Sequence, residues 1–522
     1  MFSVVFPLDF KKQSRWGCVQ FNYFSYYMIN TIASTPSIIW PLFVLLLSIS
    51  WVVLGITKLK LHPFLTLMIA AVIVGLLSGP LPDPSAENKG LFHDRVDLPS
   101  SEKTNYALAL TWSLLGFGNT AGGVGLIIAL AAIVGTCMLK SGAADRVVRF
   151  LLLLFGEKKA GLVLLLSGFI LSIPVFFDTV FFLLIPIARA MAVRTGGKYI
   201  FYVMAMAGAG AITHSMVPPT PGPLMIADGL GLDMGNALIA GLIASVLPAC
   251  LVLYLANFFA RKYDFPMREV AGSTRKNLES VVEKSDAELP SVYLSFLPIA
   301  LPIILISGVS LIKISALQNH NLFPVLVFLG EPNVAMALAA LSSVYILVQQ
   351  SKKGNPQCKE KTASFLSKEL QEPLSTAGMI ILITGAGGAY GGMIRLSGVG
   401  QSIEHLAREF NISYVLLAWS VTALIRVAQG SATVAMITGV GLMSAILGDG
   451  GSLPYDLLYI FLAIGFGSIT LSWMNDSGFW VVQRLSGFTE NEMLKTWSIL
   501  LTAISLMGLL ICLTGSILMP LK

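Results

Sequence analysis

Long apolar segments alternate with short polar ones along most of the chain. Residues 38–56, 65–77 and 500–519 are three segments made mainly of apolar side chains. A helix of about 20 apolar residues spans a bilayer, so segments of this kind predict membrane helices. The pattern predicts an all-α polytopic membrane protein with about ten transmembrane helices and two re-entrant hairpins, in about 12–14 hydrophobic segments.

The composition favours the same class of protein. Of the 522 residues, 55% are hydrophobic and 12% are charged. A soluble domain carries about 25% charged residues. The net charge of +6 comes from basic residues at segment ends, which is typical of the positive-inside rule and not of a nucleic-acid surface. We expect a multi-pass protein of the bacterial inner membrane, with the lipid bilayer as its surroundings and no nucleic-acid partner.

The most polar interior stretch is residues 261–290, which separates two halves of similar size. This stretch predicts a cytoplasmic linker between a first repeat at 36–260 and a second repeat at 291–522. Residues 1–35 precede the first repeat as an N-terminal tail. The tail lacks the short apolar core and cleavage site of a signal peptide, and both Met1 and Met28 are candidate start residues.

The two halves contain matching motifs in the same order. Residues 210–215 read GAITHS and residues 467–472 read GSITLS, and a polar interruption follows each motif. The apolar block 160–193 has basic flanks, whereas 411–447 has acidic flanks, so we expect one hairpin to enter from inside and the other from outside. This arrangement is the inverted repeat of secondary transporters.

Four polar interruptions lie within apolar segments, at 172–179, 214–223, 426–433 and 472–478. A charge at mid-bilayer costs about 2.5–3.5 kcal/mol, and broken helices occur only where protein or a water-filled cavity satisfies the backbone. The interruptions therefore predict the binding site.

Two aspartates in these interruptions are candidates for proton coupling. Asp178 follows two phenylalanines, and Asp476 lies between Asn475 and Ser477. Asp178 alternatively caps the second helix of the first hairpin. Asp476 alternatively belongs to a polar helix break that the cavity solvates.

Arg426 is the expected partner of an anionic substrate, because a guanidinium stays charged and binds carboxylates with two hydrogen bonds. It alternatively holds Asp178 or Asp476 in a structural ion pair. A buried His214 alternatively has its own hydrogen bonds and no role in transport. Uncharged donors near a helix start fit a polyhydroxy acid. The predicted substrate-binding residues are Arg426, Gln429, Ser431, Thr433, His214, Thr220, Asn475 and Ser477.

The sequence contains no pattern for a cofactor, a metal centre or an enzyme. Its five cysteines show no paired spacing, and neither CxxC nor HExxH occurs. We therefore expect no cofactor and no metal, with H⁺ or alternatively Na⁺ as the coupling ion. The glycine-rich run 385–392 lacks the context of a phosphate-binding loop and indicates tight helix packing or local unwinding.

From about residue 36 to its end, the chain resembles the gluconate permease (gluconate:H⁺ symporter) family of the ion transporter superfamily. The resemblance rests on the motifs at residues 173–178, 214–223, 385–392, 426–435 and 475–480. It implies proton-coupled symport of gluconate or a related sugar or hydroxy acid, and a homodimer with a scaffold domain and a mobile transport domain. Alternatives are a Na⁺-coupled carrier of another small organic anion or a D-amino acid such as D-serine, and a channel or receptor.

The chain departs from the family pattern at two of these positions. Asp178 stands where the family often has glutamate, and Thr220 stands where it has a second histidine. The shorter carboxylate keeps the acid chemistry, and the missing histidine removes a donor near the expected site. Both departures concern the choice of substrate more than the prediction of transport.

Overall fold

The computed structural model describes residues 39–82, 104–195, 199–263, 265–268, 288–314, 322–354, 362–399, 402, 413–447, 453–474 and 476–521. Within these ranges the chain is helical, and eight helices are long and apolar enough to cross a membrane. The prediction of an all-α polytopic membrane protein is confirmed. The tail at 1–35 and most of the linker lie outside the described residues.

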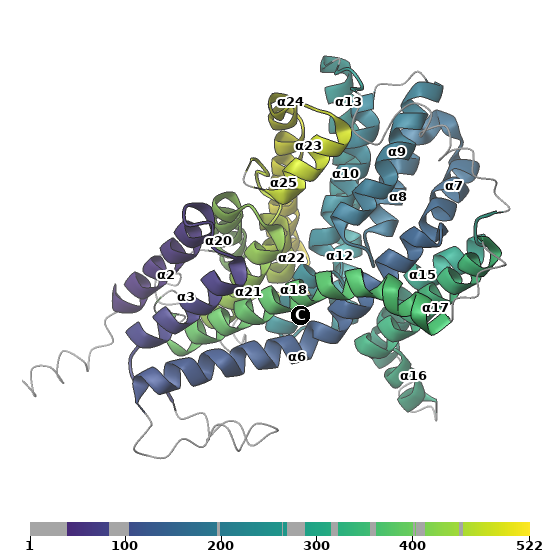
Figure 1. Cartoon of the computed structure of the whole chain (residues 1–522). Helices are drawn as coiled ribbons and strands as arrows, with labels where there is room; N and C mark the ends of the chain where they lie inside the picture. The colour runs from purple at the N-terminus through teal and green to yellow at the C-terminus, as the bar shows by residue number, and fades with distance from the viewer. Residues whose placement is uncertain are drawn as a thin grey trace, which may run out of the picture.

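Helices of the second half follow nearly the same order as those of the first (Figure 1). Among the described residues of each half, a long helix is followed by two pairs of helices, each pair separated by a polar interruption, and then by two last helices. In the first half a further short helix and a 3-10 turn come directly after the long helix. The first half contains α2 (Ile39–Thr57), α3 (Pro63–Leu77), α6 (Asn105–Lys140), α7 (Ala143–Phe155), η1 (Glu157–Lys159), α8 (Ala160–Leu171), α9 (Phe177–Thr195), α10 (Tyr199–Met216), α11 (Pro221–Gly229), α12 (Met234–Ala244) and α13 (Val246–Lys262). The second half contains α15 (Val292–Ile314), α16 (Phe323–Leu329), α17 (Pro332–Gly354), α18 (Thr362–Leu396), α20 (Tyr414–Gln429), α21 (Ala432–Leu447), α22 (Leu458–Gly467), α23 (Ser477–Ser486), α24 (Glu490–Lys495) and α25 (Trp497–Leu518).

All four predicted interruptions are places where one helix ends and another begins. They separate α8 from α9, α10 from α11, α20 from α21 and α22 from α23. The 12 residues of α8 and the 16 of α20 extend about 18 and 24 Å, less than the about 30 Å of a bilayer core. Such lengths suit the arms of hairpins, and their entry from opposite membrane faces stays a prediction.

Local chemistry explains why the helices end where they do. Gly430 has φ +83°, a left-handed conformation that stops α20 and that L side chains rarely adopt. Pro221 occupies the first turn of α11, where its missing N–H is not needed. The Asp476 carboxylate caps α23 by accepting a hydrogen bond from Gly478 N at 2.9 Å.

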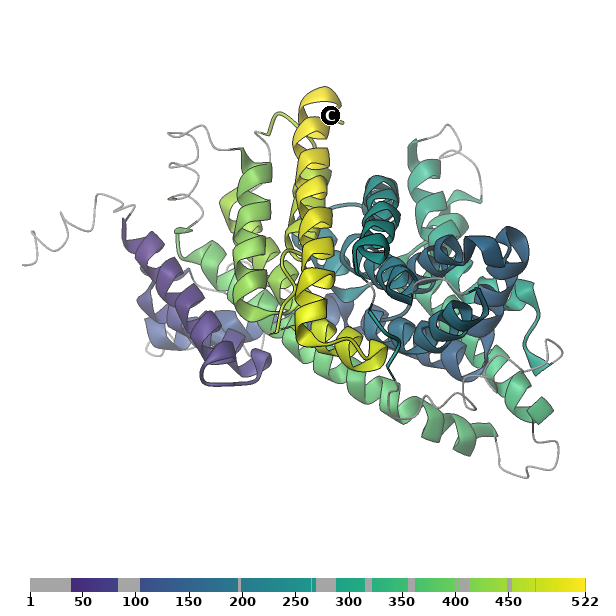
Figure 2. The ribbon, with the colours of Figure 1, turned by 90° about the horizontal axis from the view of Figure 1, so that it is seen from above.

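The long helices α6 and α18 lie side by side across the molecule, at an angle to α10, α13 and α25 (Figures 1 and 2). The glycine-rich run lies inside a continuous α18, so close packing is the correct alternative and local unwinding is wrong. A methyl group on Gly391 would lie 2.7 Å from the Cα of Gly441 in α21. The two backbones approach closely only because both residues are glycine.

Buried apolar side chains form two clusters. The smaller cluster joins α2, α3, α6 and α18 to parts of α20 and α21. The larger one contains residues of α8 and α9 and of most of α10–α13 and α22–α25.

Candidate functional site

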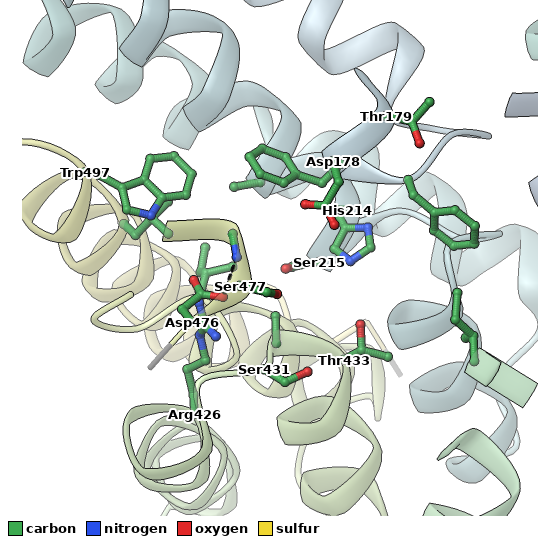
Figure 3. A pocket seen from close by; sticks show the side chains of 18 of the residues that line it. Asp178, Thr179, His214, Ser215, Arg426, Ser431, Thr433, Asp476, Ser477 and Trp497 are labelled. Carbon is green, nitrogen blue, oxygen red and sulfur yellow. Dashed lines mark hydrogen bonds and ion pairs between the residues drawn. The ribbon is translucent and has the colours of Figure 1, made fainter. Parts of the chain in front are cut away.

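Residues from all four interruptions line one cavity of about 340 Å³, which we call the chamber (Figure 3). Helices α18 and α25 complete its wall. The polar residues that line it are Asp178, Thr179, His214, Ser215, Thr376, Arg426, Ser431, Thr433, Asp476 and Ser477. Segments that are about 300 residues apart in the chain thus form one site, as the predicted pairing of the interruptions requires.

The chamber lies at the start of three helices. The first turns of α9, α21 and α23 contribute Asp178, Thr433 and Ser477 to its lining. Each helix start carries a partial positive charge of roughly half an elementary charge and unpaired backbone N–H groups. Three such starts around one cavity favour a bound anion.

Arg426 and Asp476 form a buried ion pair at one side of the chamber. Arg426 Nη2 donates to Asp476 Oδ2, and Arg426 Nη1 donates to the carbonyl of Gly430. Arg426 is 3% exposed and Asp476 is 6% exposed. The alternative in which Arg426 holds an aspartate is therefore the observed arrangement, and that aspartate is Asp476. The Nε of Arg426 has no hydrogen-bond partner among the described residues.

Other side chains hold Asp476 in place. Ser472 donates its hydroxyl to Asp476 Oδ2, and Trp497 Nε1 donates to Ser472 Oγ at 2.7 Å. The ring of Trp497 also stacks on Phe177 of α9, with the ring centroids 5.9 Å apart. This connected set of hydrogen bonds fixes the geometry of the carboxylate and links both halves of the chain.

Asp178 has a different environment. It lies in the first turn of α9, exposed to the chamber, and within the described part of the chain no hydrogen bond or ion pair involves its carboxylate. It stands inside the helix and not at the capping position before it. The cap alternative therefore has no hydrogen bond to support it, whereas a carboxylate open to the chamber is available to a proton.

The remaining predicted residues divide into two groups. His214, Ser431, Thr433 and Ser477 line the chamber, and His214 Nδ1 has no hydrogen-bond partner among the described residues. The alternative in which His214 is a buried histidine with its own hydrogen bonds therefore has no support at Nδ1 among the described residues. Asn475 lies outside the described residues.

Thr220 and Gln429 do not line the chamber. The Thr220 hydroxyl donates to the carbonyl oxygens of His214 at 3.0 Å and Val217 at 2.7 Å, so it stabilises the interruption between α10 and α11. Gln429 is buried at the end of α20, 5% exposed. The Oε1 atom of Gln429 has no hydrogen-bond partner among the described residues. That either side chain contacts the substrate stays a prediction.

The prediction from sequence missed several residues of the site. Ser215, Ser472 and Trp497 are the most informative, since Ser215 and Trp497 line the chamber and Ser472 and Trp497 hold Asp476 in place. A signal was present for the serines, because they end the repeated motifs GAITHS and GSITLS. No local pattern distinguishes Trp497 from the other tryptophans of the chain.

Comparison with known proteins agrees with this architecture. MtrF of Neisseria gonorrhoeae, described as illuminating a class of antimetabolite efflux pumps, superposes with a TM-score of 0.58 at 14% identity, over 88% of this chain and 96% of MtrF. The YdaH transporter of Alcanivorax borkumensis gives a TM-score of 0.52 at 16% identity, over 88% of this chain and 98% of YdaH. At these identities the likeness establishes the fold alone.

Relatives found by sequence have higher sequence identity to this chain than the two solved structures. An uncharacterized permease of Haemophilus influenzae is 33% identical over 470 residues, 88% of each chain. A gluconate permease of Pseudomonas aeruginosa is 32% identical over 475 residues, 90% of this chain and 96% of that protein. The inner membrane permease YgbN of Escherichia coli is 29% identical over 483 residues, 91% of this chain and 98% of that protein.

These relatives are permeases and not enzymes, and together with the eight candidate spans they confirm a multi-pass protein of the bacterial inner membrane. The family model for the GntP family permease matches residues 110–518, which include every helix that contributes to the chamber. The chain therefore belongs to the GntP family of permeases.

Proposed function

We propose that this permease imports gluconate or a closely related sugar acid together with protons. The observation that carries the proposal is the convergence of three helix starts and Arg426 on one polar chamber. The relatives of this chain include the Pseudomonas gluconate permease, 32% identical over 475 residues, and an L-idonate transporter of Escherichia coli, 27% identical over 470 residues. A chamber of about 340 Å³ suits a small metabolite.

The substrate carboxylate binds at the start of α21. Asp178 already places a negative charge at the start of α9, and Asp476 does so at the start of α23. The third start has only the neutral Ser431, whose hydroxyl accepts a hydrogen bond from Val434 N at 3.3 Å. An anion is attracted there without competing with an internal carboxylate.

Hydroxyl groups of the substrate have several partners in the chamber. Ser215, Thr433 and Ser477 offer donors and acceptors, and the protonated carboxyl group of Asp178 offers one O–H donor and an acceptor oxygen. His214 Nδ1 adds a nitrogen with no partner among the described residues. These groups satisfy a polyhydroxy chain better than an apolar one, because buried polar groups are costly when unpaired.

The charges in the chamber support coupling to a proton. Arg426 and Asp476 neutralise each other, so among the described residues that line the chamber the carboxylate of Asp178 is the charge without an ion-pair partner. A monoanion next to ionised Asp178 is repelled, whereas protonation of Asp178 removes the repulsion. Proton and substrate therefore bind together, and Asp178 is the proton carrier while Asp476 positions Arg426.

Alternating access in a homodimer completes the proposed mechanism. The two hairpins and two interrupted helices that surround the chamber belong to both halves of the chain. Their movement relative to α6 and α18 would expose the chamber to one membrane face and then to the other. The proposed permease is a homodimer, as the family resemblance implies.

Uptake by proteoliposomes tests the proposal. Purified protein should accumulate labelled gluconate under an imposed pH gradient with the inside alkaline, and an imposed Na⁺ gradient should have no effect. Accumulation driven by Na⁺ alone would favour the rival carrier with a different coupling ion. Absence of both binding and uptake for a panel of sugar acids and hydroxy acids would reject the substrate class.

A further inference from the structure

A second, smaller cavity of about 180 Å³ adjoins the chamber. We call it the annex. It shares five lining residues with the chamber, among them His214, Ser431 and Thr433. The start of α21 therefore borders both cavities. A ligand held at this helix start can extend from the chamber into the annex.

The two cavities differ in chemistry. The residues that line the annex and not the chamber are Pro221, Ile383 and Val434, and all three are apolar. Those found only in the chamber include the ion pair Arg426–Asp476. Polar groups of the annex are confined to the side it shares with the chamber. Its far wall offers no side-chain hydrogen-bond partner among the described residues.

We infer that the annex selects substrates, and that it takes an apolar portion of the sugar acid whose carboxylate and hydroxyl groups occupy the chamber. This inference rests on the proposed function and specifies the substrate class further. The preferred substrate is a hydroxy acid that lacks a hydroxyl at one carbon of its chain. A fully hydroxylated acid fits the same site with one hydroxyl facing Val434 and Ile383.

The physical reason is the cost of an unpaired hydroxyl. A hydroxyl buried against apolar side chains loses its hydrogen bonds to water and gains none from the protein. A hydrogen or methyl group at that position loses nothing and gains apolar contact. Removing that one hydroxyl should tighten binding by about tenfold, whereas removing a hydroxyl that is bonded in the chamber should weaken binding by about tenfold.

Competition binding with purified wild-type protein tests the inference. Labelled D-gluconate is displaced by the complete series of its mono-deoxy analogues, each of which lacks a single hydroxyl. We expect one analogue to bind about tenfold more tightly than gluconate and the others to bind more weakly. If every analogue binds more weakly than gluconate, the annex does not receive part of the substrate and the inference is wrong.

A matched pair of variants locates the effect. Val434→Thr adds a hydroxyl at constant volume to the wall of the annex and should abolish the advantage of the preferred analogue. Val440→Thr is the control, because Val440 is equally buried on α21 but lines neither cavity. Equal changes in both variants would contradict the inference. If Val434→Thr fails to fold, Ile383→Thr makes the same test from α18.

The outcome separates this inference from the proposed function. Failure of gluconate and of all its analogues to bind would reject the proposed substrate class, and this inference with it. Binding of gluconate with no analogue preferred would reject the annex inference alone. Binding of one preferred analogue, with the preference lost only in Val434→Thr, would support both.

Discussion

The two halves of the chain contribute polar groups to the chamber in different ways. The second half brings Arg426, Asp476 and Ser472 already joined by hydrogen bonds. The first half brings Asp178 and His214, and within the described residues neither the Asp178 carboxylate nor His214 Nδ1 has a hydrogen-bond partner. A connected network has one geometry, whereas free groups can exchange protons and ligands. The second half therefore fixes the geometry of the charged side of the chamber, whereas the proton-binding role that we propose belongs to Asp178 of the first half.

The largest expected effect comes from Arg426→Gln in the second half, where the polar groups are joined by hydrogen bonds. Removing the guanidinium leaves the buried carboxylate of Asp476 without its counter-charge, so the free energy of unfolding should fall by about 3–5 kcal/mol. Gluconate binding should be lost as well, because the anion loses its cationic neighbour. Chemical denaturation in detergent and a binding assay measure the two effects.

A double variant serves as the control for this prediction. Arg426→Gln with Asp476→Asn removes both charges at nearly constant volume, so stability should recover most of the loss while binding stays absent. A single variant Arg426→Gln that is as stable as the wild type would contradict the view that the pair organises the second half.

Asp178→Asn tests the first half, whose carboxylate has no hydrogen-bond partner among the described residues. The substitution removes no observed hydrogen bond, so the free energy of unfolding should change by less than about 0.5 kcal/mol. Accumulation should be lost, since with one proton per substrate a gradient of one pH unit supports about tenfold accumulation and the variant carries no proton. Exchange of labelled for unlabelled gluconate across the membrane should persist and become independent of pH.

Uptake and exchange measured in the same proteoliposomes decide this prediction. Asp476→Asn is the matched control, because it alters the other carboxylate and should lower stability by breaking the pair with Arg426. If Asp178→Asn still accumulates substrate with the pH dependence of the wild type, the proton is carried elsewhere.

Trp497→Phe probes the contact between the halves with a smaller change. The variant keeps the stacking on Phe177 and loses the hydrogen bond to Ser472, at a cost of about 1–2 kcal/mol in the free energy of unfolding. Gluconate affinity should fall by only a few-fold, because Ser472 can still donate to Asp476. An affinity loss as large as that of Arg426→Gln would mean that Trp497 contacts the substrate directly.

Much of this architecture is predictable from sequence because its causes are local. Polar and proline-containing stretches inside apolar segments predict the four helix interruptions, and each is found where expected. The glycine-rich run predicts either close helix packing or unwinding, and only the continuous helix α18 and the close approach of Gly391 to Gly441 decide for packing. Local patterns therefore predict where helices are interrupted or closely packed, but they do not predict which segments pack against them.

Side-chain partners in the site depend on contacts between distant segments and were less predictable. The sequence left open whether Arg426 binds the substrate, Asp178 or Asp476, because these residues lie on three different elements. Thr220 lies within a predicted interruption, yet it faces two carbonyl groups and not the chamber. Its direction follows from the path of a few backbone atoms, which no motif specifies.

Thr220→Val is the smallest perturbation and tests the side-chain hydrogen bonds that Thr220 makes within the interruption between α10 and α11. The isosteric change removes the hydrogen bonds to the carbonyls of His214 and Val217, so the free energy of unfolding should fall by about 1 kcal/mol. Gluconate affinity should stay within about twofold, because the hydroxyl lies outside the chamber. Thr433→Val is the matched control with the opposite pattern, since Thr433 lines the chamber and should lose affinity without losing stability. If Thr220→Val has normal stability and weakened binding, the Thr220 hydroxyl contacts the substrate. The first half would then contribute a substrate contact at a residue that we assign to structure alone.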